Sequence, residues 1–374
     1  MIKLKKVSEM NERIVLENAQ FLNGHNADIT IEKGFITEIS APFTSKGDRK
    51  DCTGHFISSG WIDMHAHAFS KLEPYGDHLD DIGIKQGVTT IVDAGSCGVD
   101  QISELLEEAS DAKTNLLVFL NVSKMGLQRL DELSDLSWIN RKEIFDVVNA
   151  NDDQIVGLKA RISKSVVKKN GLKPLILSRL LADDCALPLM VHIGSSPPSV
   201  KDVLTYLKKG DIVTHYLNGK NNQPFYENGK PMQELLNAIN RGVLLDVGHG
   251  SASFSFEVAE QAKQNGIHFH TISTDIYRNN RLAGPVYSLA NVMSKFLHIG
   301  YSLDEVIAGV TTNAANWLKR PELGRIQVGD RANLTLFKVE EGSFTLVDSE
   351  GVKRKASQMI KAKGVFINGE WYQC

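Results

Sequence analysis

Histidines, a lysine and an aspartate stand where buried strands of this sequence are expected to end. His65 and His67 lie two positions apart after an apolar run, so both side chains point to one face of the expected strand, as does Asp63. Two imidazoles in this arrangement can hold a metal ion, although a lone His-x-His pair is more often two ordinary polar residues. The rest of the sequence decides between these interpretations.

Three further apolar runs end in a metal-binding residue type at the same relative position. They are His192 in MVHIG, His215 in VTHYL and Asp275 in TISTD. Burying a polar side chain without a partner costs roughly 2–7 kcal/mol, so repeated placement at strand ends calls for a common partner. Imidazole and carboxylate ligands suit zinc, and also manganese, iron or cobalt. We therefore favour a metal site over four independently paired core residues.

Lys159 in QIVGLKARI stands inside an otherwise apolar strand, where lysine is disfavoured. Burial lowers the pKa of a lysine and favours the neutral amine, which can add carbon dioxide to form a carbamate. A carbamate is an anion with two oxygens and can bridge two metal ions. The alternative is a lysine that extends from the strand end to solvent, and the metal-binding residues at the other strand ends argue against it.

Arg161, His249 and Tyr277 are candidate substrate contacts. Arg161 lies two positions beyond Lys159 and shares its strand face, where a guanidinium could bind a substrate carboxylate through two hydrogen bonds. His249 in DVGHG and Tyr277 in STDIYR follow the seventh and eighth expected strands, where barrel enzymes usually place substrate contacts. An outward arginine and ordinary loop residues are the alternatives for these three positions.

Apolar strands that alternate with amphipathic helices are expected to position these residues. The expected strands cover residues 55–65, 89–95, 115–123, 154–162, 187–194, 211–217, 242–250 and 268–275. Stretches expected as helices include 100–113, 199–210, 231–242 and 255–266. Eight alternations predict a parallel (β/α)8 TIM barrel, for which about 250 residues is typical. A doubly wound open sheet is the alternative, but its GxGxxG turn is missing.

The two ends of the chain show short alternating strands separated by glycine-containing turns. Because chain ends commonly lie close together, we expect one small β-sandwich domain built from both termini. The expected domains are residues 1–57 for the N-terminal part of the sandwich, 58–322 for the (β/α)8 barrel and 323–374 for the C-terminal part of the sandwich.

The composition favours an enzyme that acts on a small molecule. The 374 residues carry 42 Lys and Arg against 45 Asp and Glu, which gives no basic surface for nucleic acid. The N-terminal segment has scattered charges and no apolar core of a signal peptide, and no later run is apolar enough to span a membrane. We therefore expect a cytoplasmic homo-oligomer with a small-molecule substrate and no membrane or nucleic-acid partner.

The motif GWIDMHAH, the strand lysine of GLKAR and the histidines and aspartate that follow resemble the binuclear members of the amidohydrolase superfamily. The likeness covers nearly the whole chain, because GVTTNAANWL followed by GRIQVGDRANLTLF resembles the closing helix of the family and its return to the sheet domain. Ser59 and Ala314 stand where many members have proline, and neither is an expected ligand.

The resemblance implies a pair of divalent ions, with zinc the first choice. The implied ligands of the more buried ion are His65, His67 and Asp275. Those of the more exposed ion are His192 and His215. Carbamylated Lys159 and a hydroxide would bridge the two ions, and Asp275 would also serve as the general base.

The resemblance also narrows the reaction. Mononuclear deaminases of this superfamily pair the histidine of the fifth strand with a nearby glutamate, whereas HIGSSPPS contains no acid and Lys159 is present. The order of GLKARIS, HIGSSP, THYLNG and DVGHGSASFSF is most similar to a branch labelled dihydroorotase or adenine deaminase whose members deacetylate small acids. This implies a deacetylase or esterase acting on a small acylated carboxylic acid, either an acetyl ester of a 2-hydroxy acid or an N-acetyl amide, with Arg161 on the carboxylate. A cyclic amidase of the dihydroorotase or hydantoinase type, an adenine-type deaminase and a non-catalytic assembly protein remain alternatives.

Overall fold

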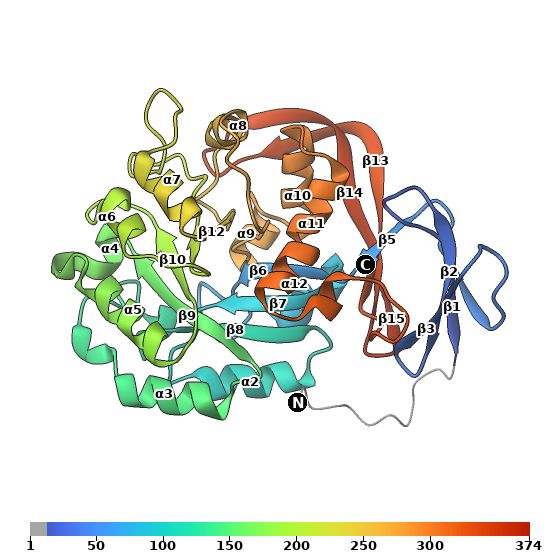
Figure 1. The fold of residues 1–374 in the computed structure, drawn as a ribbon, viewed down its shortest axis with the longest axis horizontal. Coiled ribbons are helices and arrows are strands. Elements are labelled where there is room, and N and C mark those ends of the chain that lie inside the picture. Colours follow the sequence, from blue (N-terminus) through green and yellow to red (C-terminus); the bar gives the residue numbers. More distant parts are fainter. Residues whose placement is uncertain (1–12) are drawn as a thin grey trace.

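The computed structural model describes residues 13–374 and contains a parallel barrel beside a second sheet (Figure 1). The barrel with its surrounding helices occupies the left and centre of the view. The blue N-terminal strands and the red C-terminal strands lie side by side on the right. Residues 1–12, which contribute to the expectation that no signal peptide is present, lie outside the described residues.

The barrel sheet of the described chain has seven parallel strands in the order β12-β11-β10-β9-β8-β7-β6. The strands are β6 Trp61–Ala66, β7 Val88–Ala94, β8 Asn115–Asn121, β9 Ile155–Ile162, β10 Leu189–Ile193, β11 Ile212–Thr214 and β12 Leu244–Asp246. Nearly every residue of β6, β7 and β8 is buried, because outer helices cover one face and the barrel interior covers the other. The expected parallel barrel is confirmed.

The eighth expected strand, residues 268–275, is not a regular strand. Instead, two isolated parallel bridges close the ring on this segment, one between Asp246 and Thr271 and one between Ala66 and Ile276. Asp275 adopts a left-handed backbone with a φ of 52°, and a regular β-ladder cannot continue through such a residue. The segment therefore takes the place of an eighth strand while turning Asp275 out of the regular pleat.

The first expected strand, residues 55–65, is divided between the two sheets. β5 (Phe56–Ser59) pairs antiparallel with β13 (Leu334–Val347), whereas β6 begins at Trp61 in the barrel. A Cβ on Gly60, which lies between them, would be 2.1 Å from Oγ1 of Thr89, so the chain crosses against a neighbouring strand here. The apolar run is continuous because both sheets bury it. The sequence pattern alone therefore did not reveal that the chain passes from one sheet to the other within this run.

Strands from both chain ends form one sheet of eight strands in the described residues, in the order β15-β14-β13-β5-β1-β2-β3 with β4 on β1. The remaining bounds are β1 Ile14–Gln20, β2 Asn26–Glu32, β3 Phe35–Ser40, β4 Asp48–Asp51, β13 Leu334–Val347, β14 Lys353–Ile367 and β15 Glu370–Gln373. Apolar side chains from both ends, including Leu16 and Leu334, share one core. The composite sheet domain is confirmed, and its expected limits in the sequence remain predictions.

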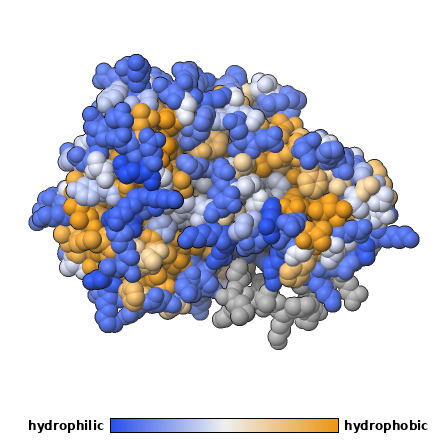
Figure 2. All heavy atoms as spheres, viewed as in Figure 1, coloured by the Kyte–Doolittle hydropathy of each residue, from blue (hydrophilic) through white to orange (hydrophobic). Residues whose placement is uncertain are grey.

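Helices surround the barrel, and the four stretches expected as helices correspond to α2, α6, α7 and α8. The bounds are α1 Leu79–Ile82, α2 Ile102–Asp111, α3 Arg141–Ala150, α4 Lys164–Val167, α5 Lys173–Asp184, α6 Val200–Thr205, α7 Gln233–Asn240, α8 Phe256–Gln264, α9 Arg278–Leu282, α10 Leu289–His298, α11 Leu303–Gly309 and α12 Thr312–Trp317. None of the helices in residues 13–374 is long and apolar enough to cross a membrane. On the face shown in Figure 2, hydrophobic side chains are interspersed with hydrophilic ones.

The hairpin of β13 and β14 reaches from the sheet domain over the barrel (Figure 1). The backbone N–H of Ile360 donates to Ser294 on α10 at 2.9 Å. At the hairpin tip, Asp348 accepts a hydrogen bond of 3.0 Å from the N–H of Phe256 at the start of α8. The Ser349 hydroxyl donates to the carbonyl of Gly250 at 2.9 Å. The sheet domain thus holds the loop that follows β12.

Candidate active site

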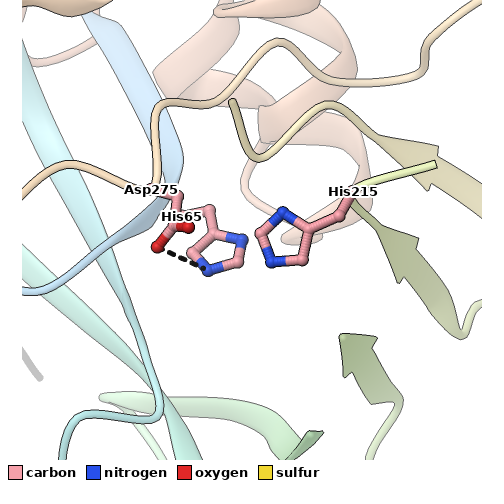
Figure 3. Close-up of side chains that lie close together, drawn as sticks. All are labelled: His65, His215 and Asp275. Atoms are coloured by element: carbon pink, nitrogen blue, oxygen red, sulfur yellow. Dashed lines mark ion pairs between the residues drawn. The ribbon is translucent and has the colours of Figure 1, made fainter. Parts of the chain in front are cut away.

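The structure brings His65, His215 and Asp275 together at the carboxyl ends of the barrel strands. Each offers a ligand atom, and these atoms lie within 4.8 Å of one another (Figure 3). His67 joins them through its Nε2, which lies 3.0 Å from Oδ1 of Asp275. The ring centroid of His192 is 4.5 Å from that of His215. Residues predicted from separate strand ends therefore meet in one cluster.

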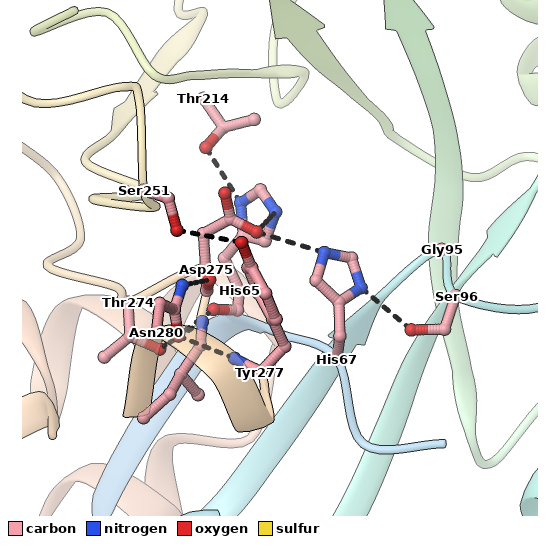
Figure 4. Close-up of polar contacts among 12 residues, drawn as sticks. His65, His67, Gly95, Ser96, Thr214, Ser251, Thr274, Asp275, Tyr277 and Asn280 are labelled. Atoms are coloured by element: carbon pink, nitrogen blue, oxygen red, sulfur yellow. Dashed lines mark hydrogen bonds and ion pairs between the residues drawn. The ribbon is translucent and has the colours of Figure 1, made fainter. Parts of the chain in front are cut away.

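Three of the histidines have their Nδ1 atoms held by groups outside the cluster. His65 Nδ1 lies 2.9 Å from the hydroxyl of Thr214, and His67 Nδ1 lies 2.8 Å from that of Ser96 (Figure 4). His215 Nδ1 donates to the carbonyl of Gly248 at 2.6 Å. A hydrogen bond at one ring nitrogen fixes the orientation of the imidazole and leaves the other nitrogen directed inward, as in metal-binding histidines.

The donor set of this cluster fits a divalent metal ion. Nε2 of His215 is buried and has no hydrogen-bond partner among the described residues, an arrangement that is costly unless a ligand completes it. Burial lowers the pKa of His215 to about 3, so its ring is neutral and Nε2 keeps a free lone pair. Burial also lowers the pKa of His65. Neutral imidazoles beside a carboxylate are ligands that zinc and related ions accept.

Asp275 is held on several sides. Its N–H donates to the carbonyl of His65 at 2.6 Å, and the Asn280 amide donates to its carbonyl at 2.9 Å (Figure 4). Burial alone would raise the pKa of Asp275, but nearby His65 and the hydrogen bond from His67 bring that pKa below its usual range. A Cβ on Gly250 would lie 2.4 Å from Oδ2, so this close approach requires glycine. The carboxylate is therefore ionised and fixed in place.

Lys159 is buried within β9, as its strand position predicts. Its Nζ lies 3.2 Å from Nε2 of His65 and 3.2 Å from the sulfur of Met190. No carboxylate forms an ion pair with it among the described residues. Burial lowers the pKa of Lys159 to about 7, so a large fraction of the amine is neutral near that pH. This is the state that adds carbon dioxide, and carbamylation stays a prediction.

Asp246 is a residue of the site that the sequence interpretation missed. It is fully buried at the end of β12 and accepts hydrogen bonds from Thr214, Thr271 and Ser273 at 2.6–2.8 Å. Its Oδ2 also lies 3.6 Å from Nδ1 of His65. Asp246 therefore joins neighbouring strand ends and orients the hydroxyl that holds His65. The available signal was an acid at the end of an apolar strand, as for Asp275.

Arg161 lies on β9 near the cluster, but its guanidinium is paired with Glu132. Two parallel contacts of 2.6 Å join Nε and Nη2 of Arg161 to the carboxylate of Glu132, which is fully buried. Nη2 also donates to the carbonyl of Leu130 at 3.2 Å. Within the described chain, Nη1 is left without a partner. Binding of a substrate carboxylate by Arg161 stays a prediction, now with one guanidinium nitrogen available for it.

His249 and Tyr277 lie in different environments. His249 is fully buried, with Nδ1 2.9 Å from the carbonyl of Gly250 and Nε2 2.7 Å from Nζ of Lys295. It shapes the loop after β12, and its predicted contact with a substrate gains no support from this burial. Tyr277 is partly exposed beside Asp275, and its hydroxyl lies 2.9 Å from that of Ser251 (Figure 4). Its position at the opening of the site suits the predicted role.

A parallel barrel with histidines, a lysine and an aspartate at its strand ends has the architecture of a barrel enzyme with a metal centre. A protein-family model described as Amidohydrolase family matches residues 56–372, and the chain belongs to this family. It is therefore a hydrolytic enzyme, and the predicted superfamily is confirmed.

Similar proteins extend this comparison. A protein of Enterococcus faecalis named deacetylase is 38% identical over 369 residues, covering 97% of this chain and 100% of that protein. A deacetylase of Brucella anthropi is 34% identical over 354 residues, covering 92% and 87% of the two chains.

Solved structures also match nearly the full length. The crystal structure of an adenine deaminase has a TM-score of 0.93 and 38% identity, covering 96% of this chain and 99% of that chain. A dihydroorotase has a TM-score of 0.91 and 31% identity, covering 96% and 98%. These names describe different reactions, so the choice among them must come from the site.

Proposed function

We propose that this protein is a metal-dependent deacetylase that hydrolyses the acetyl ester or N-acetyl amide of a small carboxylic acid. The observation that carries the proposal is the buried cluster of neutral histidines around ionised Asp275, with His215 Nε2 unpartnered in the described chain and Arg161 nearby. The two curated relatives named deacetylases support the same reaction class.

The residues of the cluster suit two divalent ions. His65, His67 and Asp275 would hold one ion, His192 and His215 would hold the other, and Lys159, as a carbamate, would lie between them. We propose zinc, and the same ligand types accept manganese, iron or cobalt. When bound, such ions lower the pKa of coordinated water and polarise the carbonyl of the acyl group.

Asp275 is the proposed proton carrier. Its carboxylate is ionised, and the contacts of its backbone with His65 and Asn280 hold it beside the cluster. It can accept a proton from the attacking water and pass it to the departing alcohol or amine. Tyr277 would contact the substrate at the opening of the site, and Nη1 of Arg161 would donate to the carboxylate of the acid.

Deamination of adenine and hydrolysis of a cyclic amide are the competing reactions, since two structural relatives carry those names. The loop after His192 has the sequence HIGSSPPS and contains no acid, whereas mononuclear deaminases of the superfamily have a glutamate there. The buried Lys159 likewise favours a binuclear site. These features favour attack on an acyl carbonyl over deamination.

The test is a substrate screen of the purified, metal-loaded protein. N-acetyl and O-acetyl acids of both hands are assayed for acetate release, with adenine and dihydroorotate as comparison compounds. We expect acetate release that a chelator abolishes and that zinc, manganese or cobalt restores. Ammonia from adenine, or ring opening of dihydroorotate without acetate release, would overturn the proposal. A protein that takes up no metal on loading and turns over none of these compounds would favour a non-catalytic assembly protein.

A further inference from the structure

Lys220 lies in the loop that follows β11 and His215, and hydrogen bonds fix the backbone on both sides of it. The side-chain amide of Asn218 donates to the carbonyl of His215 at 2.8 Å, and its oxygen accepts the N–H of Lys220 at 3.0 Å. The amide of Asn222 donates to the carbonyl of Gly194 at 2.8 Å. Lys220 is therefore held relative to His215 and to the strand that carries His192.

The ammonium of Lys220 has no hydrogen-bond or ion-pair partner in residues 13–374, although its side chain is partly buried. Burial lowers the pKa of Lys220, and the charge of Asp275 acts in the opposite direction. The contacts of Asn218 and Asn222 place Lys220 in the loop beside His215 and the end of β10. A partly buried cation without an anion is unfavourable, so this position suits an anionic ligand.

Arg161 is also a cation close to the cluster, but its charge is paired within the protein. Its charge is compensated by buried Glu132 through the two contacts of 2.6 Å. A substrate carboxylate brought to Arg161 alone would also be repelled by the carboxylate of Glu132. Glu350 lies against Gly219 in the hairpin contact but forms no ion pair with Lys220 among the described residues. Of Arg161 and Lys220, only Lys220 has a charge that no carboxylate among the described residues compensates.

We propose that Lys220 is the specificity-determining residue that binds the carboxylate of the substrate, with Nη1 of Arg161 as a second donor. The inference rests on the proposed deacetylase function and specifies which residue supplies the counter-charge. The substrate is then an acyl ester or amide of a small acid. Its carboxylate lies toward the loop after β11 while the acyl carbonyl lies over the metal-binding cluster.

The test compares Lys220→Met and Lys220→Arg with Lys230→Met, a matched control at an exposed lysine of the same β11–α7 connection. Each protein is assayed on an acetylated acid and on its neutral methyl ester. We expect Lys220→Met to lower kcat/KM for the acid by about tenfold to a hundredfold, mainly through KM, and to spare the ester. Lys220→Arg should retain part of the activity, and Lys230→Met should retain all of it. Equal losses on acid and ester would overturn the inference.

A binding measurement separates this inference from the proposed function. Calorimetry on the metal-loaded protein compares lactate with methyl lactate, neither of which carries an acetyl group. We expect Lys220→Met to weaken lactate binding by about tenfold or more without affecting methyl lactate. Unchanged lactate binding would reject the role of Lys220 even if acetylated acids are hydrolysed. A lysine-dependent lactate affinity without any deacetylation would retain Lys220 as a carboxylate site and reject the deacetylase.

Discussion

Two regions of the site pair their polar groups in different ways. The floor is formed by His65, His67, His215 and Asp275. The opening is formed by Arg161, Lys220 and Tyr277. On the floor, every outward ring nitrogen of these histidines has a partner at 2.6–2.9 Å. The inward nitrogens of His65 and His67 contact other members of the cluster, and Nε2 of His215 has no partner among the described residues. At the opening, the guanidinium of Arg161 is paired with the carboxylate of Glu132. The Lys220 ammonium has no partner among the described residues. Internal hydrogen bonds thus fix the reacting groups, whereas a bound substrate would complete the recognition groups.

The largest effect is expected from the floor. Lys159→Ala should lower turnover by more than about a hundredfold, because changes to outer partners of metal ligands already cost about tenfold to a hundredfold. Added short carboxylic acids should restore part of the activity by standing in for the carbamate. Turnover and metal content per chain are the measurements. If Lys159→Ala kept two ions and normal turnover, the carbamate would be excluded.

At the opening, Arg161→Met tests how strongly Glu132 holds the guanidinium. Removing one partner of a buried ion pair costs roughly 3–5 kcal/mol, so we expect a loss of that order in the free energy of unfolding. The double variant Arg161→Met with Glu132→Gln should recover much of it, because no unpaired charge is then buried. Urea unfolding of the three proteins measures this. Turnover should fall about tenfold or more on an acetylated acid and less on its methyl ester, since Arg161 would supply one donor.

The outer partners of the floor are tested by Thr214→Val, which replaces a hydroxyl with a methyl group of similar size. His65 would lose its 2.9 Å contact and Asp246 would lose one donor. We expect metal affinity to fall about tenfold to a hundredfold with the fold retained. Metal titration against a competing chelator gives the affinity, and Thr205→Val on the exposed side of α6 is the control. Equal affinity in both variants would show that Thr214 does not orient His65.

Lys295, behind the opening, can be compared with Lys220. It is a buried lysine whose ammonium has hydrogen-bond partners. Its Nζ lies 2.7 Å from Nε2 of His249 and 2.8 Å from the carbonyl of Pro285. Burial lowers the pKa of Lys295 from 10.5 to about 7. Between these pH values the unfolded chain binds more protons, so the free energy of unfolding should rise with pH by up to about 1.4 kcal/mol per unit.

Lys295→Met should remove this contribution, which is fully present above pH 10.5 and is lost progressively as the pH falls from 10.5 through 7. Unfolding free energies at about pH 7.5 and pH 9.5 give the slope for both proteins. The comparison of slopes isolates Lys295 from other groups that titrate in this range. Parallel slopes would mean that Lys295 keeps its proton in the folded protein.

The eighth expected strand shows which structural features a sequence pattern can predict and which it cannot. The run HFHTISTD correctly predicted an apolar segment ending in Asp275, because apolar spacing is a local property. It did not predict the left-handed backbone at Asp275, since that conformation depends on His65 and Asn280 from elsewhere in the chain. The run 55–65 likewise looked like one strand, although two sheets share it.

The amino-acid sequence by itself determined the barrel, the composite sheet and the residues able to bind metal. Strand alternation and the position of a polar residue at the end of an apolar run act over a few residues, so they can be recognised without knowing the fold. These features identified the candidate site residues His65, His67, Lys159, His215 and Asp275.

Only the tertiary structure decided which polar groups are already paired. Glu132 reaches Arg161 from the segment after β8, Lys295 reaches His249 from α10, and the loop around Lys220 brings no anion to its ammonium among the described residues. These outcomes depend on how loops of different strands pack against one another, and pairing at that distance leaves no periodic signal in the sequence. The structure therefore pairs the charge of Arg161, buries His249 and leaves the Lys220 ammonium available for a ligand.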